Sequence, residues 1–298
     1  MMKNENGAAA LTPKIRPAET ARLKKLLFGG VRFILLALFL VAALLPLYWV
    51  VVTSLKGSRE IYAFPIQYWP RSFNLANYAY LFKISKFQVY FRNSVFVSLL
   101  GSAGAMLVAM LSGYALSRFR AKRVRMVFLL GMYFTQIIPT YMIMTPLYSF
   151  LAQFGLTDNL LMLSVIYIGT MIAFASIMGS GFFAMVPVSV EEAAQIDGCN
   201  RFQALFQIVV PLVLPGLAAI FSFSFVNIWN ELFLAVMFMN SDQNMTIPVA
   251  LNSFISKAGV SWEVLSAGIV VALLPTLVVF AFAQKYIVVG LTEGAIKE

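Results

Sequence analysis

Residues 159–184 read NLLMLSVIYIGTMIAFASIMGSGFFA, an apolar run with no Asp, Glu, Lys or Arg. A helix that crosses a bilayer needs about 20 consecutive, mostly apolar residues. Five further runs reach that length, at 28–52, 91–116, 126–151, 211–238 and 266–290. The sequence therefore predicts an all-α membrane protein with six transmembrane helices.

The composition of the whole chain agrees with this fold class. Of the 298 residues, 61% are hydrophobic and 11% are charged, whereas soluble domains carry about 25% charged residues. The first run is longer than the apolar core of a secretory signal and no Ala-x-Ala site follows it, so we expect it to be retained. We expect a basic cytoplasmic tail at 1–27, one six-span domain at 28–290, and a cytoplasmic tail at 291–298.

Positive charge predicts the orientation of these spans. Seven Lys/Arg residues precede Phe33 and five lie within 118–125, both beside apolar runs, which favours a topology signal over a nucleic-acid site. With both termini cytoplasmic, fifteen of the 22 Lys/Arg lie inside and seven outside. Cytoplasmic loops are enriched in Lys and Arg. The prediction is an N-in, C-in protein.

Several kinds of chemistry are excluded. The chain has no histidine and a single cysteine, Cys199, which removes Ser-His hydrolases, His-ligated zinc proteases and His-ligated haem. It also lacks the Gly-x-x-x-x-Gly-Lys-Ser/Thr phosphate loop, so we do not expect it to hydrolyse ATP. We predict no catalytic residue, no metal site and no bound cofactor.

Small residues recur at every fourth position of the second run, at Gly101, Ala105, Ala109, Gly113 and Ser117. Such a stripe allows two helix backbones to approach closely. We therefore expect this face to pack on protein rather than on lipid.

The loop at 187–211, which we call the coupling loop, has the pattern of a capped helix. Ser189 and Glu192 have capping-box spacing, which predicts Ser189 as the N-cap. Gly198 can end the helix in a left-handed conformation, and an amphipathic piece follows at 201–210. An ordinary loop helix and a docking helix are both compatible with these residues.

A resemblance to a known protein family favours the docking helix over the ordinary loop helix. Glu192-Ala193-Ala194, then Gly198, then Ile208-Val209-Val210-Pro211 resemble the EAA loop of ABC importer permeases, at its usual place between the fourth and fifth of six spans. Val210 stands where leucine is usual, and Cys199 where the sugar subfamily usually has alanine. Asn77-Tyr78, Asn93-Ser94, Trp229-Asn230-Glu231 and residues 290–297 are similar to the carbohydrate-uptake subfamily of the maltose-permease G type.

This resemblance implies the type I ABC importer permease fold in the bacterial cytoplasmic (inner) membrane. It implies a second permease of the F type as heterodimer partner, two ATPase subunits that use ATP and Mg, and an extracytoplasmic sugar-binding protein. The chain would be the permease subunit that takes up a sugar or oligosaccharide. The residues implied to contact the ATPase are Ser189, Glu191, Glu192, Ala193, Ala194, Asp197 and Gly198.

The fifth run contains an acid, Glu231, beside Asn227, Trp229 and Asn230. An acid inside a span is costly and usually faces a cavity or a partner. These four residues are the candidates for the translocation pathway, where amides, carboxylates and aromatic rings suit a sugar. The favoured alternative for Glu231 is a structural hydrogen bond to a neighbouring span.

Two other functions remain open. A similar importer could carry a non-sugar solute such as glycerol phosphate. A self-sufficient secondary transporter is less favoured, because such proteins usually show more intramembrane charges and an internal repeat of spans.

Overall fold

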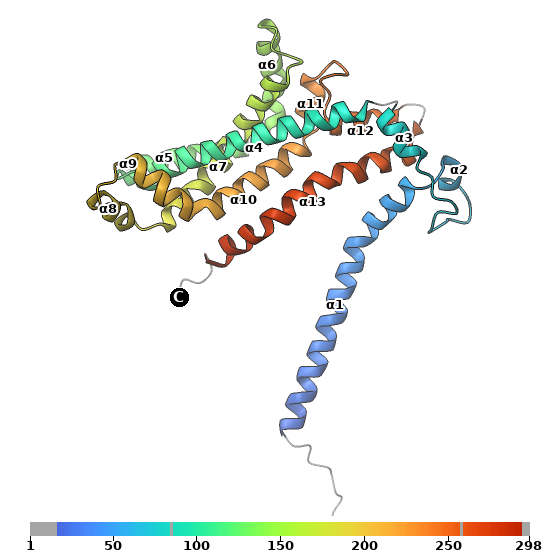
Figure 1. The fold of residues 1–298 in the computed structure, drawn as a ribbon, viewed down its shortest axis with the longest axis horizontal. Coiled ribbons are helices and arrows are strands. Elements are labelled where there is room, and N and C mark those ends of the chain that lie inside the picture. Colours follow the sequence, from blue (N-terminus) through green and yellow to red (C-terminus); the bar gives the residue numbers. More distant parts are fainter. Residues whose placement is uncertain (1–16, 84–85, 257–258, 294–298) are drawn as a thin grey trace, which may run out of the picture.

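The computed structural model describes residues 17–83, 86–256 and 259–293, which are almost entirely helical (Figure 1). A two-stranded antiparallel ribbon pairs Ile255–Ser256 with Gly259–Val260. The helices are α1 Pro17–Ser54, α2 Ser58–Ile61, α3 Ala76–Lys83, α4 Phe87–Arg118, α5 Lys122–Ile137, α6 Thr140–Gln153, α7 Leu160–Met185, α8 Val188–Ile196, α9 Arg201–Gln203, the π-helix η1 Ala204–Val209, α10 Val210–Trp229, α11 Phe233–Phe238, α12 Ile247–Ser253 and α13 Trp262–Glu293.

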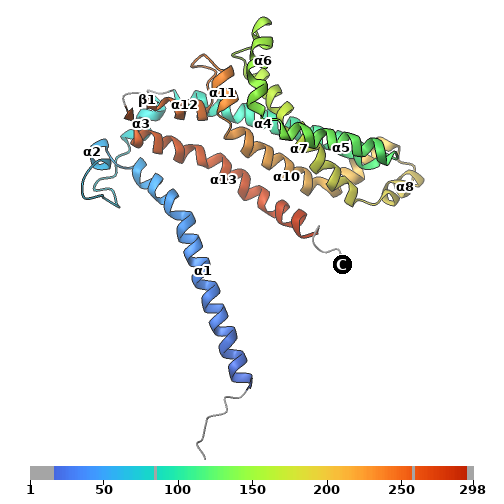
Figure 2. The same ribbon diagram turned by 180° about the vertical axis from the view of Figure 1, so that it is seen from behind.

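Of the two predicted tails, residues 1–16 and 294–298 lie outside the described residues. Residues 17–27 form the beginning of α1 and residues 291–293 the end of α13. Helix α1 projects away from the other helices and meets them near its C-terminal end (Figures 1 and 2). None of its most apolar window is buried inside this chain. A long apolar helix in this position needs lipid or another subunit as its surroundings.

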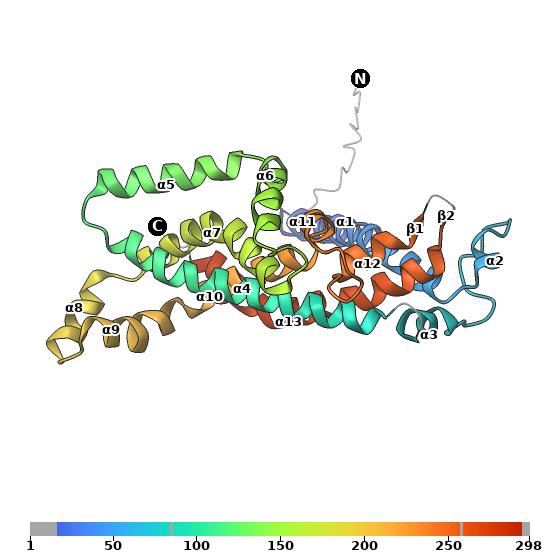
Figure 3. The same cartoon turned by 90° about the horizontal axis from the view of Figure 1, so that it is seen from above.

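Helices α4, α7, α10 and α13 form the bundle at the centre of the molecule (Figure 3). Helices α4 and α7 approach closely, because an added β-carbon at Gly113 would lie 2.6 Å from the backbone carbon of Gly179. Ala105 and Ala109 of the same stripe are fully buried. The predicted packing of the small-residue stripe on protein is confirmed, because only residues with little or no side chain fit between these backbones.

Within the described residues, five helices are long and apolar enough to span a membrane, and a bent pair makes a sixth if both helices belong to one span. The bent pair corrects the prediction of a single helix over 126–151. Helices α5 and α6 meet at 88° across Ile138 and Pro139. Proline disfavours helical geometry in the residue before it, and Ile138 is extended, with φ −74° and ψ 121°.

The predicted span at 211–238 also needs correction, at both ends. The helix begins earlier, because α9, η1 and α10 run continuously from Arg201 to Trp229. It then stops, and a separate short helix, α11, begins at Phe233. Glu231 therefore lies in a break between helices rather than in a helical turn. This break and the coupling loop lie toward opposite ends of the bundle (Figure 1).

Candidate functional site

The coupling loop begins with α8, directly after α7. Its N-cap is Pro187, with no side-chain hydrogen bond to the helix. The prediction of Ser189 as N-cap is therefore wrong, and this residue lies inside the first turn. The proline ring fixes φ near −65°, and with φ −60° and ψ 141° Pro187 leads the chain into the helix before the serine is reached.

The end of α8 agrees with the prediction. Gly198 has φ +92°, in the left-handed region, and its N–H donates to the carbonyl of Gln195 at 3.1 Å. A second helical segment then starts with a capping box between Asn200 and Gln203. The sequence interpretation missed this box, although Asn-x-x-Gln has the required spacing.

The predicted coupling residues are divided between a buried side and an exposed side of α8. Glu191 and Ala194 are buried, whereas the other five members of the set are exposed: Ser189, Glu192, Ala193, Asp197 and Gly198. Large apolar side chains share the exposed side, since Ile196 is 86% exposed and Phe202 is 76% exposed. An exposed surface that combines an acid, a small residue and large apolar groups is typical of a protein contact.

Glu191 turns toward the membrane helices. Its Oε1 lies 2.6 Å from Nε of Arg118, the last residue of α4. Its Oε2 accepts a hydrogen bond from the hydroxyl of Tyr114 at 2.8 Å. The sequence interpretation assigned Arg118 to the topology signal and missed this contact, since no local pattern connects residues so far apart.

The break at Glu231 is organised by its carboxylate. Oε2 accepts a hydrogen bond from the Tyr167 hydroxyl of α7 at 2.7 Å. The backbone N–H of Leu234 donates to Oε1 at 3.0 Å, and that of Ala235 donates to Oε2 at 3.2 Å. These N–H groups belong to the first turn of α11, where helical partners are lacking. The bond to Tyr167 is the structural hydrogen bond to a neighbouring span that the favoured alternative predicted. The capping of α11 was not predicted.

The other three pathway candidates lie apart from this carboxylate's contacts. Trp229 is buried, donates from Nε1 to the carbonyl of Ala272 at 3.1 Å, and stacks on Phe225. Asn227 and Asn230 are exposed, and each donates to a carbonyl of its own helix. In this conformation the indole is covered by its neighbours and offers no free face for stacking on a sugar.

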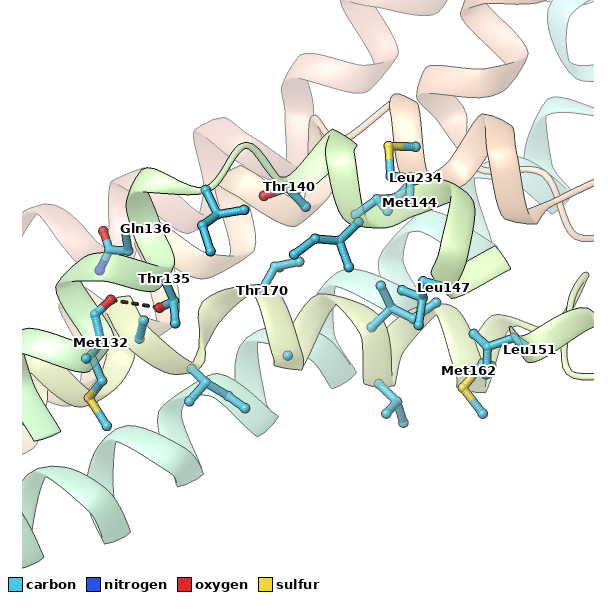
Figure 4. A pocket seen from close by; sticks show the side chains of 18 of the residues that line it. Met132, Thr135, Gln136, Thr140, Met144, Leu147, Leu151, Met162, Thr170 and Leu234 are labelled. Carbon is cyan, nitrogen blue, oxygen red and sulfur yellow. Dashed lines mark hydrogen bonds between the residues drawn. The ribbon is translucent and has the colours of Figure 1, made fainter. Parts of the chain in front are cut away.

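A cavity of about 1000 Å³ lies between α5, α6 and α7 (Figure 4). Its wall is mostly apolar and is completed by Leu234 of α11, whose backbone N–H is held by Glu231. The side chains with hydrogen-bonding groups in the wall are Thr135, Gln136, Thr140 and Thr170. None of the four predicted pathway residues lines it. Polar residues beside Pro139 were the signal that could have indicated this hollow.

The loop after α11 is fastened by Asp158, which lies between α6 and α7. Its Oδ1 accepts hydrogen bonds from the backbone N–H of Asn240 at 2.9 Å and of Ser241 at 3.1 Å. Burial raises the pKa of this carboxyl, but the hydrogen bonds outweigh burial, and the pKa lies below its ordinary value. The carboxylate form therefore links the α6–α7 loop to the segment after α11.

Comparisons with known proteins show which family and which proteins this chain is similar to. The family described as "Binding-protein-dependent transport system inner membrane component" matches residues 105–292. The chain is 34% identical to the inner membrane ABC transporter permease protein YcjP of Escherichia coli K12, over 88% of this chain and 94% of that protein. It is 33% identical to the sulfoquinovosyl glycerol transport system permease protein SmoH of Agrobacterium fabrum, over 91% and 95% of the two chains.

A solved structure has the same fold. It is the crystal structure of a bacterial ABC transporter involved in the import of the acidic polysaccharide alginate. One of its chains aligns with a TM-score of 0.75 and 25% identity, over 92% of this chain and 99% of that one. The family match covers more than half of the chain and contains the coupling loop and the cavity wall. The chain therefore belongs to the inner membrane components of binding-protein-dependent transport systems.

Proposed function

We propose that the chain is the permease subunit of an ABC importer that takes up a sugar or oligosaccharide. ATP hydrolysis by partner subunits drives alternating access of its pathway. The similarity to the sulfoquinovosyl glycerol permease and to the alginate importer supports a carbohydrate substrate. The observation that carries the proposal is α8, with Glu192 and Ala193 on its exposed face and left-handed Gly198 at its end.

The proposal includes three kinds of partner. A second permease of the F type completes the pathway, two ATPase subunits bind ATP and Mg, and an extracytoplasmic binding protein delivers the sugar. Helix α8 docks on one ATPase subunit through its exposed face. Because α8 follows α7 directly and leads through η1 into α10, a displacement of α8 moves both helices.

The docking role is tested with two substitutions in the coupling loop. Glu192→Lys reverses the charge of the docking face, and Gly198→Asp places a β-carbon in a left-handed conformation that costs roughly 1–2 kcal/mol. We expect both variants to insert in the membrane but to lose transport-coupled ATPase activity. The measurements are ATPase co-purification and hydrolysis stimulated by loaded binding protein in proteoliposomes.

Gly155→Asp is the matched control. Gly155 also has positive φ, at +65°, and nothing lies within 4 Å of an added β-carbon there or at Gly198. It lies in the α6–α7 loop, away from α8, so it introduces similar backbone strain without touching the ATPase. Wild-type co-purification and stimulation in both coupling-loop variants would refute the docking role.

We also propose that the cavity between α5, α6 and α7 is this subunit's part of the translocation pathway. Its threonines and Gln136 offer hydrogen-bonding groups in an otherwise apolar wall. Gly169 lines the cavity and has nothing within 4 Å of an added β-carbon. Gly169→Phe should therefore fill the hollow without disturbing the packing of this chain.

We expect Gly169→Phe to abolish uptake while both permeases and the ATPase still co-purify. The substrate for the assay is the carbohydrate that raises the melting temperature of the transporter's extracytoplasmic binding protein. Gly181→Phe is the control, since Gly181 is also unobstructed but does not line the cavity. Loss of the second permease from the Gly169→Phe complex would instead identify the hollow as a subunit interface and overturn this proposal.

A further inference from the structure

Arg118 is the last residue of α4 and contacts both the end of α7 and the first turn of α8. Its Nε pairs with Glu191 of α8 at 2.6 Å. Its two terminal nitrogens donate to carbonyls at the end of α7, Nη1 to Phe183 at 3.1 Å and Nη2 to Val186 at 2.9 Å. One guanidinium therefore connects the end of α4 with the end of α7 and the first turn of α8.

Arg118 is more deeply buried than three of the basic residues that follow it. The Arg118 side chain is 15% exposed and that of Glu191 is 7% exposed, and they form the one ion pair found within the described ranges of the chain. Arg120, Lys122 and Arg123 are exposed. Exposed charges of this kind contribute little to structure, whereas a buried pair that loses one partner leaves an uncompensated charge.

The geometry uses properties that only arginine has. The planar guanidinium can donate from three nitrogens in fixed directions, whereas lysine provides one compact charge. The Phe183 and Val186 carbonyls lie at the C-terminal end of α7, where helical carbonyls lack partners and a positive charge is favourable. The aromatic ring of Tyr114, which also binds Glu191, packs on Phe183 at 5.7 Å.

The connection matters most for α4. Helix α8 is joined to α7 directly and to α10 through η1, but no short segment of chain joins α8 to α4. Along the membrane region α4 and α7 are already in backbone contact at Gly113 and Gly179. The contacts of Arg118 and Tyr114 with Glu191 connect α8 directly to the end of α4.

We propose that Arg118 is a positioning residue that makes α8 and the adjoining ends of α4 and α7 move as one body. This inference rests on the proposed function, in which an ATPase subunit moves α8. Without Arg118, α8 still follows the ATPase and remains joined by the chain to α7 and α10, but its position relative to the ends of α4 and α7 is no longer fixed. ATP hydrolysis then moves α8 relative to α4 instead of moving the two together.

The test measures the distance between spin labels at Arg120, two residues after the end of α4, and at Gln195 of α8, both exposed, in the purified complete transporter with Cys199→Ser. Distances are compared without nucleotide and after trapping with ATP, Mg and vanadate, so no substrate is needed. We expect the same distance in both states when Arg118 is present. In Arg118→Gln we expect the distance to shift on trapping, with vanadate-trapped nucleotide at the wild-type amount.

Three further variants make the outcome decisive. Arg118→Lys should fold with its charge pair intact and still show a shift, because lysine cannot also hold both α7 carbonyls. Combining Arg118→Gln with Glu191→Gln removes the unpaired charge but does not restore the connection between α8 and the ends of α4 and α7. The distance between the labels should therefore shift in this variant as well. The matched control Arg123→Gln should behave as wild type.

An unchanged distance in Arg118→Lys and in the double variant, with normal trapping, would overturn the proposal, since burial of charge alone would then explain the contact. Failure of the unsubstituted chain to retain an ATPase subunit or to trap nucleotide would refute the proposed function instead. The two failures are therefore distinguishable.

Discussion

Glu231 shows how one carboxylate can stabilise a broken membrane helix. The chain leaves helical geometry after Trp229, which creates unpaired N–H groups at the start of α11. The Glu231 carboxylate accepts hydrogen bonds from two of these N–H groups and from Tyr167. The same bonds position Leu234, whose side chain lines the cavity. A structural role for Glu231 therefore affects the shape of the hollow.

Replacing Glu231 with alanine should lower both the melting temperature of the transporter and its uptake. The substitution leaves the buried Tyr167 hydroxyl and the Leu234 N–H without their acceptor, and an unsatisfied buried polar group costs about 1–3 kcal/mol. The measurements are thermal unfolding in detergent and uptake in proteoliposomes. Asn230→Ala is the control, because Asn230 is exposed and bonds only its own helix in this structure. Equal melting temperatures for the two variants would contradict this role.

At the scale of elements, the contact between α4 and α7 depends on glycine. An added β-carbon at Gly179 would lie 2.5 Å from the Ala109 carbonyl oxygen, and one at Gly113 would meet the Gly179 backbone. Backbone atoms cannot rotate away as a flexible side chain can. The two helices must therefore separate if either glycine gains a side chain, and this separation would extend to the α8 end of the bundle.

We expect Gly179→Ala to destabilise the protein by about 1–3 kcal/mol, as is typical of an overpacked core. Gly181→Ala, two residues further along the same helix, meets nothing within 4 Å. It should leave the unfolding temperature unchanged or slightly higher, because alanine is the better helix former. Thermal unfolding of the two variants side by side is the measurement. A Gly179→Ala protein as stable as Gly181→Ala would show that the helices tolerate a wider separation.

At the scale of the whole molecule, α8 and the loop after α11 lie toward opposite ends of the bundle (Figure 1). The five Lys/Arg residues within 118–125 lie at the α8 end, and the N-in, C-in prediction makes that end cytoplasmic. The loop fastened by Asp158 would then face the extracytoplasmic side. This orientation allows one ATPase contact and one binding-protein contact on opposite sides of the membrane.

Single cysteines at Arg120 and Asp242 test this orientation in a Cys199→Ser background. Both residues are exposed, so a membrane-impermeant maleimide should reach each from its own side. We expect Asp242→Cys to react in intact spheroplasts, and Arg120→Cys to react only after the membrane is opened. Equal reaction of both cysteines in intact spheroplasts would show that the predicted topology is wrong.

Local features of the chain were predictable because they depend on neighbouring residues. Apolar runs of sufficient length identify membrane helices whatever they pack against. The small-residue stripe of α4 and the left-handed Gly198 were also predicted correctly, since each follows from residue size at a known spacing. The N-cap at Pro187 and the bend at Pro139 differ from the prediction, although both are effects of proline on adjacent backbone.

Contacts between distant helices were decided only by the tertiary structure. Glu191 and Glu192 are adjacent and chemically identical, yet one is buried against Arg118 and the other is exposed. Glu231 reaches Tyr167, 64 residues away, while its neighbour Trp229 faces α13. Which side chains meet depends on the rotation and register of each helix, and these are set by close packing such as that of Gly113 on Gly179. The sequence alone determined that the chain forms membrane helices and where the coupling loop lies, and packing between helices determined which residues act together.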